Sequence, residues 1–180
     1  MSQPVRVAVI SGSLRKGSYN TQLVRFVAGK IRGEGVETDE ISLLDLDLPL
    51  MNEDLEKQGL PAGVLDLKKR LIAADVLLIS SPEYNGSLSP ALKNAACFRG
   101  KVGALLAASP GKIGGLRGLR HLRQILTQIQ TLVHPNEFAL GSAHEAFDEA
   151  GNLKDAMATK LAVGVGEAAV GLARAVRAAG

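Results

Sequence analysis

The chain has 180 residues, of which 46% are hydrophobic and 22% are charged, a balance that excludes long-range disorder and predicts a single domain over residues 1–180. Lys and Arg exceed Asp and Glu by only 21 to 18, giving a net charge of +3, so the sequence has no basic tail. Aromatic residues make up 3% of the chain, too few for the base-stacking surfaces of single-strand binders, and we expect no nucleic-acid partner.

The first predicted elements are a strand, a polar loop and a helix. Residues 5–10 are a β-branched apolar run, typical of a buried strand, and they lead into a polar loop over residues 11–19. Either Ser18 or Asn20 can cap the helix that follows, because both side chains accept hydrogen bonds from the first amides of a helix. Apolar residues recur at helical spacing as far as residue 32, after which glycines end the helix.

A weaker strand, an irregular stretch and a second helix come next. Residues 36–43 alternate weakly between apolar and polar side chains and predict the second strand. Residues 45–59 are expected to be an irregular acidic stretch, after which Pro61 can open a helix that ends near residue 74. Residues 75–80 are again continuously apolar and predict the third strand.

The same order of strand, polar loop and helix then recurs. Residues 81–89 form the second polar loop, and Pro90 starts a short helix. Residues 101–108 predict the fourth strand, residues 109–115 the third polar loop, and residues 116–129 a helix with one apolar face. The last expected elements are a fifth strand over residues 131–140, broken by Pro135, and a long Ala-rich helix over residues 154–178.

Continuously apolar strands that alternate with helices imply a parallel sheet covered on both faces, which is the doubly wound α/β fold class. In such sheets, ligands bind beyond the carboxyl ends of the strands. The three polar loops all follow strands, so we expect them to gather at that edge and to form the functional site.

The first polar loop has the composition of a phosphate site. It reads Gly12-Ser13-Leu14-Arg15-Lys16-Gly17-Ser18-Tyr19-Asn20 and combines hydroxyls, a guanidinium and a helix N-terminus, which together suit a phosphate dianion. Gly12 and Gly17 have the spacing of the nucleoside-triphosphatase loop, but Ser18 and Tyr19 stand where that loop requires Lys and Ser or Thr. A nucleoside triphosphatase is therefore excluded, and an ordinary glycine turn capped by serine is the alternative.

Two of the loops together resemble the NADPH-dependent FMN reductase family, whose flavodoxin-like members include quinone, azo-dye and chromate reductases. Residues 12–20 are similar to the FMN phosphate loop of that family, and we call them the phosphate loop. A second segment is similar to the isoalloxazine loop of that family, and we call it the ring loop: Ser81-Pro82-Glu83-Tyr84-Asn85-Gly86-Ser87. The family motif continues after it with Leu92-Lys93-Asn94-Ala95. Residues 108–115 and 121–126 also match. The resemblance runs from about Val5 to Phe147 and implies a flavodoxin-like, five-stranded parallel sheet in the order 2-1-3-4-5.

The resemblance also implies roles for individual residues. The FMN phosphate would be held by Ser13, Arg15, Ser18 and Asn20, with Lys16, Gly17 and Tyr19 completing the loop. Backbone groups of Pro82, Glu83, Tyr84, Asn85 and Gly86 would contact the flavin ring, and Ser109 would approach it from the third polar loop. Because the flavin itself carries the electrons, no side chain is expected to act as an acid or base, and we name no catalytic residue.

The function implied is that of an enzyme, an NAD(P)H-dependent oxidoreductase with FMN as its cofactor and NADPH or NADH as the hydride donor. It would pass two electrons to a quinone, free flavin or similar small-molecule acceptor, and it would form a homodimer or homotetramer. A non-enzymatic FMN-binding electron carrier of flavodoxin type is a second hypothesis.

One departure from the family pattern motivates a third hypothesis. Family members continue from the Lys-Asn-Ala motif into a longer helix, whereas here residues 95–100 lead almost directly to the strand that contains Val102. The helix after the ring loop should therefore be short, and a degenerate homologue without flavin is the corresponding alternative.

The remaining polar residues carry weaker expectations. The three histidines, His121, His134 and His144, are not clustered, so no metal site is expected. Cys97 cannot form an internal disulfide and should be a buried, inert thiol. A basic stripe can form from Lys112, Arg117, Arg120 and Arg123, either to receive the pyridine-nucleotide phosphate, to pair with acidic groups of another subunit, or as a solvated helix face. We assign no role to Asp45, Asp47, Glu53 and Asp54.

The apolar runs are far shorter than the roughly 20 residues needed to cross a bilayer, and we expect no membrane span. Residues 1–6 do not resemble the start of a signal peptide, and the lone cysteine fits a reducing compartment, so a cytoplasmic location is expected.

Overall fold

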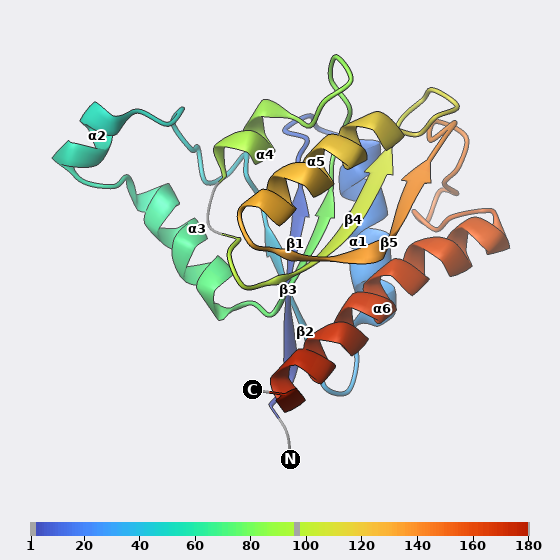
Figure 1. Ribbon diagram of the computed structural model, residues 1–180. Coiled ribbons are helices and arrows are strands. Elements are labelled where there is room, and N and C mark those ends of the chain that lie inside the picture. The colour runs from blue at the N-terminus through green and yellow to red at the C-terminus, as the bar shows by residue number, and fades with distance from the viewer. Residues whose placement is uncertain (1–2, 96–97, 180) are drawn as a thin grey trace.

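The computed structural model describes residues 3–95 and 98–179. Within these residues, five strands form one parallel sheet in the order β2-β1-β3-β4-β5 (Figure 1). The strands are β1 (Val5–Ser11), β2 (Val36–Ile41), β3 (Val76–Ser80), β4 (Val102–Ala108) and β5 (Leu132–Leu140). The helices are α1 (Tyr19–Ile31), α2 (Glu53–Gln58), α3 (Ala62–Ala73), α4 (Pro90–Asn94), α5 (Leu116–Gln128) and α6 (Ala156–Ala179). The expected flavodoxin-like strand order is confirmed.

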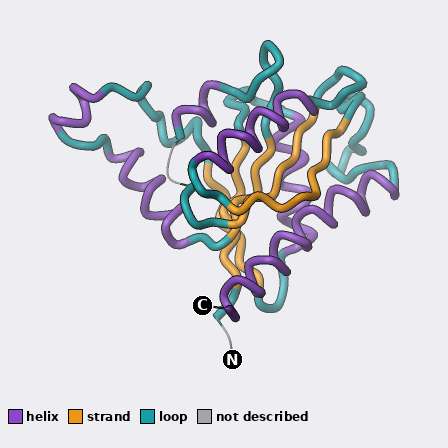
Figure 2. The backbone as a smooth tube through the Cα atoms, viewed as in Figure 1, coloured by secondary structure: helices purple, strands orange, loops and turns teal. Residues whose placement is uncertain are grey.

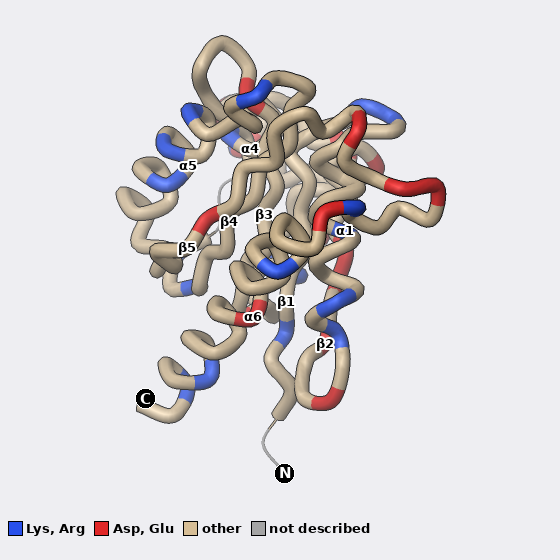
Figure 3. The backbone as a smooth tube through the Cα atoms, turned by 90° about the vertical axis from the view of Figure 1, so that its right-hand side faces the viewer, with Lys and Arg blue, Asp and Glu red and all other residues tan. Residues whose placement is uncertain are grey.

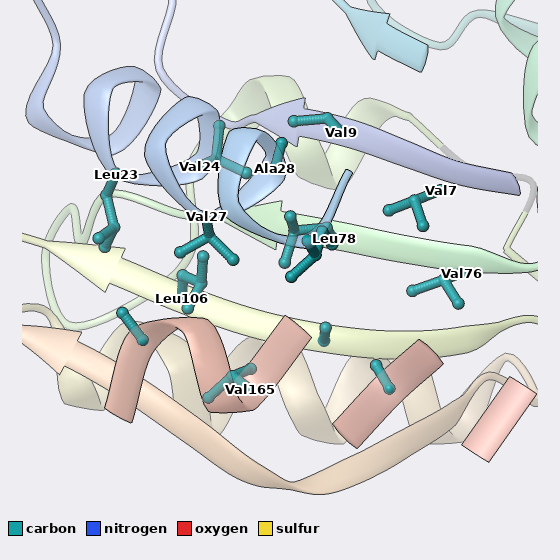
Figure 4. Packing of buried hydrophobic residues seen from close by; sticks show 14 of the residues in the cluster. Val7, Val9, Leu23, Val24, Val27, Ala28, Val76, Leu78, Leu106 and Val165 are labelled. Atoms are coloured by element: carbon teal, nitrogen blue, oxygen red, sulfur yellow. The ribbon is translucent and has the colours of Figure 1, made fainter. Parts of the chain in front are cut away.

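The sheet is covered on both faces, as its continuously apolar strands require (Figure 2). All five residues of β3 are buried, and their side chains alternate between the two layers of the core. Val76 and Leu78 pack with α1 and α6, as the close view in Figure 4 shows for α1, whereas Leu77 and Ile79 pack with α3, α4 and α5. Each helix therefore lies on the face of the sheet that its apolar side chains cover.

The predicted irregular stretch over residues 45–59 contains a helix, α2, so that expectation is wrong for residues 53–58. Asn52 caps this helix, because its Oδ1 accepts a hydrogen bond from Asp54 N at 2.9 Å. None of its six residues is buried, so the sequence carries no apolar periodicity that would reveal it. By contrast, α4 has only five residues and confirms the short helix expected after the ring loop. The prediction for Cys97 lies outside the described residues.

The proline in the fifth strand is accommodated by an irregularity in β5. Gly103 of β4 pairs with Val133, but Leu105 pairs with Glu137, so β5 carries extra residues at this point. Pro135 lies within that bulge, where a strand residue needs no backbone N–H. The strand therefore continues beyond the proline to Leu140 instead of ending at it.

The final helix, α6, lies beside α1 and covers the same face of the sheet. Among the described helices, α6 is long and apolar enough to cross a bilayer by length and composition, but its buried residues pack against the sheet and α1 as those of a core helix do. Gly166 permits the close contact, since a Cβ there would lie 3.0 Å from Val27 Cγ1 and 3.1 Å from Ile31 Cγ2. Near the end of the helix, Arg177 bonds to the carboxylate of Asp75.

An ion pair between β2 and α3 makes the stability depend on pH. Asp39 bonds to Arg70 Nε at 2.8 Å, and this guanidinium holds the pKa of Asp39 below its ordinary value of 3.8. Because the pKa is lower in the folded state, the contribution of the carboxylate to the stability of the fold is fully present above pH 3.8, and it is lost as the pH falls below that value through the lower pKa of the folded state.

We expect Asp39→Asn to lower the free energy of unfolding at neutral pH by about 0.5 kcal/mol, a small value because the pair is partly exposed. The difference from wild type should shrink in urea titrations carried out below pH 3.8. Asp45→Asn, at an exposed loop position, is the control. A deficit that stays constant across this pH range would contradict the assignment.

Candidate functional site

The three polar loops meet at the carboxyl edge of the sheet, at the upper end of the strands in Figure 1, and enclose a cleft of about 400 Å³. Its lining comes from all three loops: Ser13, Arg15, Ser18, Tyr19 and Asn20, then Pro82, Glu83 and Tyr84, then Ala108, Ser109 and Pro110. Most of the predicted site residues are therefore brought together. Lys16 and Gly17 instead line a neighbouring cavity of about 450 Å³, and Asn85 and Gly86 form the tip of the ring loop.

The phosphate loop is shaped by hydrogen bonds that its backbone N–H groups donate to its own serine hydroxyls. Ser18 caps α1, and its Oγ accepts hydrogen bonds from Asn20 N at 3.2 Å and Thr21 N at 3.5 Å. Ser13 Oγ accepts from Arg15 N at 3.4 Å. The Arg15 guanidinium lies 5.5 Å from the centre of the Tyr19 ring, close enough for a cation–π contact. The loop thus presents a cation and two hydroxyl side chains beside the start of a helix, groups that suit an anionic ligand.

Asn20 lies against the cleft but is committed to the protein itself. Its Nδ2 donates to Ala108 O at 2.9 Å, while its Oδ1 accepts from Ala108 N and from Ser80 Oγ, each at 2.9 Å. The residue is only 4% exposed. Because this amide is occupied on both sides, its side chain ties α1 to the ends of β3 and β4, a role that the sequence did not indicate.

The ring loop ends in a tight turn. Tyr84 N donates to Ser87 O at 2.9 Å, and Ser87 N donates to Tyr84 O at 3.0 Å. Between them, Asn85 and Gly86 have φ values of 52° and 75°, as a type I′ turn requires, and Asn and Gly are the residues that adopt this conformation most easily. Tyr84 is 49% exposed at the mouth of the cleft. The Asn-Gly pair therefore sets the shape of the loop through its backbone.

The carboxylate of Glu83 is bound by α5. It accepts hydrogen bonds from Arg117 Nε at 2.8 Å and from Gly118 N at 3.2 Å. Gly115, at the N-cap of α5, has no side chain to supply these bonds, so Glu83 provides a cap from another loop. The side chain of Glu83 thus holds the ring loop against α5, while the role predicted for the backbone of Glu83 stays a prediction.

The arginines of the predicted basic stripe are paired within the chain. Figure 3 shows several basic positions along α5 and an acidic position on the strand β5. Arg117 pairs with Glu83, while Arg120 and Arg123 both pair with Glu137 of β5, at 3.2 and 2.7 Å. Each of these three arginines therefore has an acidic partner within this chain. Glu137 could not be predicted as a partner, because nothing in the sequence of β5 links it to a helix face 14 residues earlier.

The histidines do not lie together in the structure. In the described part of the chain, no three His, Cys, Asp or Glu side chains are placed to share a metal ion. His121 instead shares a hydrogen bond with the ring loop, between its Nδ1 and Ser87 Oγ at 2.9 Å. The only sequence signal for this contact was that both residues lie in segments that match the same family.

Comparison with known proteins agrees with the geometry. The sequence pattern of the family described as NADPH-dependent FMN reductase matches residues 5–145. The chain is 40% identical to an NAD(P)H-dependent FMN reductase of Pseudomonas aeruginosa, over 89% of this chain and 91% of that protein. It is 38% identical to an NADPH:quinone oxidoreductase of Arabidopsis thaliana, over 84% and 83% of the two chains.

The fold is similar to that of a solved flavoenzyme. FerB, an NAD(P)H:(acceptor) oxidoreductase from Paracoccus denitrificans, superimposes with a TM-score of 0.84 at 30% identity, covering 94% of this chain and 97% of the other. On the strength of the matched sequence pattern, these relatives and the three-loop cleft, the chain belongs to the NADPH-dependent FMN reductase family.

Proposed function

We propose that this chain is an NAD(P)H-dependent oxidoreductase that binds FMN in the three-loop cleft. The observation that carries the proposal is the convergence of the phosphate loop and the ring loop on one cavity. A volume of about 400 Å³ lies within the range of cofactor sites, which are usually 300–1,000 Å³. One end of the cleft offers Arg15 and serine hydroxyls to a phosphate, and the other offers Tyr84 and loop backbone to a flat ring.

Each part of the cleft has a distinct task in this proposal. Ser13, Arg15 and Ser18 hold the phosphate, with Lys16, Gly17 and Tyr19 completing the loop. The backbone of residues 82–86, together with Ser109, positions the ring. Asn20 contributes by fixing the edge of the sheet on which both loops stand, because its side-chain amide is already bonded to Ser80 and Ala108.

Bound FMN supplies the redox chemistry, since it can accept a hydride from NADPH or NADH and deliver two electrons to a quinone, free flavin or similar small acceptor. The chain's own residues would bind the phosphate and orient the ring. Backbone donors of the ring loop can stabilise negative charge where it develops, so no acid or base side chain is assigned. We propose a homodimer or homotetramer in the cytoplasm as the working form.

The short α4 does not remove the cleft. Ser89 caps α4 and packs closely against Gly12 of the phosphate loop, where a Cβ would lie 2.9 Å from Ser89 Oγ. The ring loop and α4 therefore stay attached to the core. All three loops still meet. This arrangement favours a flavin-binding protein over a degenerate homologue without cofactor.

Titration of the apoprotein with FMN, followed by anaerobic NADPH, tests the proposal. We expect one FMN bound per chain and then bleaching of the visible flavin absorbance as the hydride is transferred. Binding without bleaching by either NADPH or NADH would indicate the electron carrier instead. A chain that binds no FMN at tens of micromolar would overturn the proposal and leave the degenerate homologue.

A further inference from the structure

The ring loop is held from outside the cleft by one face of α5. The contact is close at Gly118, where a Cβ would lie 3.1 Å from Ser87 O and 3.2 Å from Glu83 Cβ. Any larger residue would therefore push the helix away from the loop. The absence of a side chain at Gly118 lets both ends of the loop reach α5.

Two polar contacts flank this glycine. Glu83, just before the turn, binds Arg117 Nε and Gly118 N, and Ser87, at the end of the turn, bonds to His121 Nδ1 at 2.9 Å. Arg117 and His121 are four residues apart, so they lie on the same face of the helix, one turn from each other. The two ends of the turn are thus fastened to adjacent turns of one rigid element.

We propose that His121 is a positioning residue for the flavin ring, acting through Ser87. The turn needs such support because the two backbone hydrogen bonds between Tyr84 and Ser87 fix its shape but not its orientation, and Asn85 at its tip is exposed. With Glu83 alone attached, the turn can pivot about its first end. Fastening Ser87 as well fixes the plane of the backbone that, in the proposed function, faces the ring.

The attachment of the loop is tested in the apoprotein, without FMN. The amides of Tyr84 and Ser87 bond to carbonyls across the turn, so their hydrogen exchange reports how often the turn opens. We expect His121→Gln and Ser87→Ala to speed exchange at both amides about five-fold, the effect of one lost hydrogen bond. In His121→Asn, the two amides should exchange at the wild-type rate, because the amide nitrogen of Asn lies at the position of His Nδ1 and can keep the bond to Ser87. In His121→Gln, the amide nitrogen lies at the position of Nε2 instead, so the bond is lost.

Controls separate this contact from general destabilisation. Gln124→Ala changes an exposed position one turn further along α5 and should leave both amides unchanged. The double variant His121→Gln with Ser87→Ala should open no faster than either single variant, because the two residues share one interaction. Equal exchange in His121→Gln and wild type, or additive effects in the double variant, would overturn the proposal.

The effect of His121 on the flavin rests on the proposed function and is measured in the FMN-loaded protein. We expect His121→Gln to weaken binding of reduced FMN about five-fold more than binding of oxidised FMN, and therefore to lower the midpoint potential, while His121→Asn restores both. A residue that only stabilises the fold would shift neither. If wild type binds no FMN, the proposed function fails, and the exchange experiment still decides whether His121 fastens the loop.

Discussion

Asn20→Ala is expected to lower the free energy of unfolding by about 3 kcal/mol, because the substitution leaves several buried groups without partners. In the native protein, Asn20 satisfies the N–H and carbonyl of Ala108 and the hydroxyl of Ser80, all of them buried. Alanine can replace none of these bonds, so the substitution leaves the Ala108 backbone groups and the Ser80 hydroxyl without their partner. Urea unfolding followed by far-UV circular dichroism measures the loss.

Asn52→Ala is the matched control, since this asparagine caps the exposed α2 and should cost no more than about 1 kcal/mol. The Asn20 variant should also bind FMN weakly when it is folded at low temperature, because the edge that carries the loops is no longer tied together. Equal losses of stability in the two variants would show that the buried hydrogen bonds of Asn20 stabilise the fold no more than an exposed helix cap does.

Arg15→Ala is expected to raise the dissociation constant of FMN about 10- to 100-fold, the usual effect of losing a charge-assisted bond to phosphate. Arg15 lines the cleft and is exposed, so the substitution should leave the stability of the apoprotein unchanged. Titration of the apoprotein followed by flavin fluorescence measures the affinity. Arg15→Lys should bind FMN at an intermediate level, because lysine keeps the charge but cannot donate two parallel bonds.

Arg32→Ala removes the same charge from just beyond the other end of α1, where Arg32 bonds to Thr38 Oγ1 at 2.7 Å. It should affect binding of FMN far less than Arg15→Ala does. If the two alanine variants bind FMN equally well, Arg15 contributes only to the general field of the protein and does not contact the phosphate. Riboflavin, which lacks the phosphate, should bind equally to wild type and Arg15→Ala.

The sequence was most informative where the physical cause is local. Buried parallel strands need apolar side chains on both faces, so the run at residues 76–80 identified β3 without any knowledge of its partners. The phosphate loop could be found for a similar reason, since a hydroxyl-rich loop before a helix is set by residues adjacent in the chain. The ring loop was identified only through its resemblance to a known family, because an Asn-Gly pair alone predicts no more than a turn.

What the sequence could not predict depends on distant partners. The family resemblance implied that Asn20 binds the phosphate, but in the structure its side chain bonds to protein groups 60 and 88 residues away. Likewise, the sequence assigned His121 no role beyond the expectation that it binds no metal, and only the fold places Ser87 beside it. A side chain with several hydrogen-bonding groups can serve either a ligand or the protein, and only the packed structure decides between them.

The bonds of Asn20 also bear on when the cleft can form during synthesis of the chain. Ser80 and the phosphate loop are made early, but the edge they belong to is complete only when Ala108 has docked, and bonds that span so much sequence form late in folding. A nascent chain that has passed β3 but not β4 therefore has the phosphate loop without the strand end that supports it. Cofactor loading should consequently follow the emergence of β4 and cannot help the first strands to assemble.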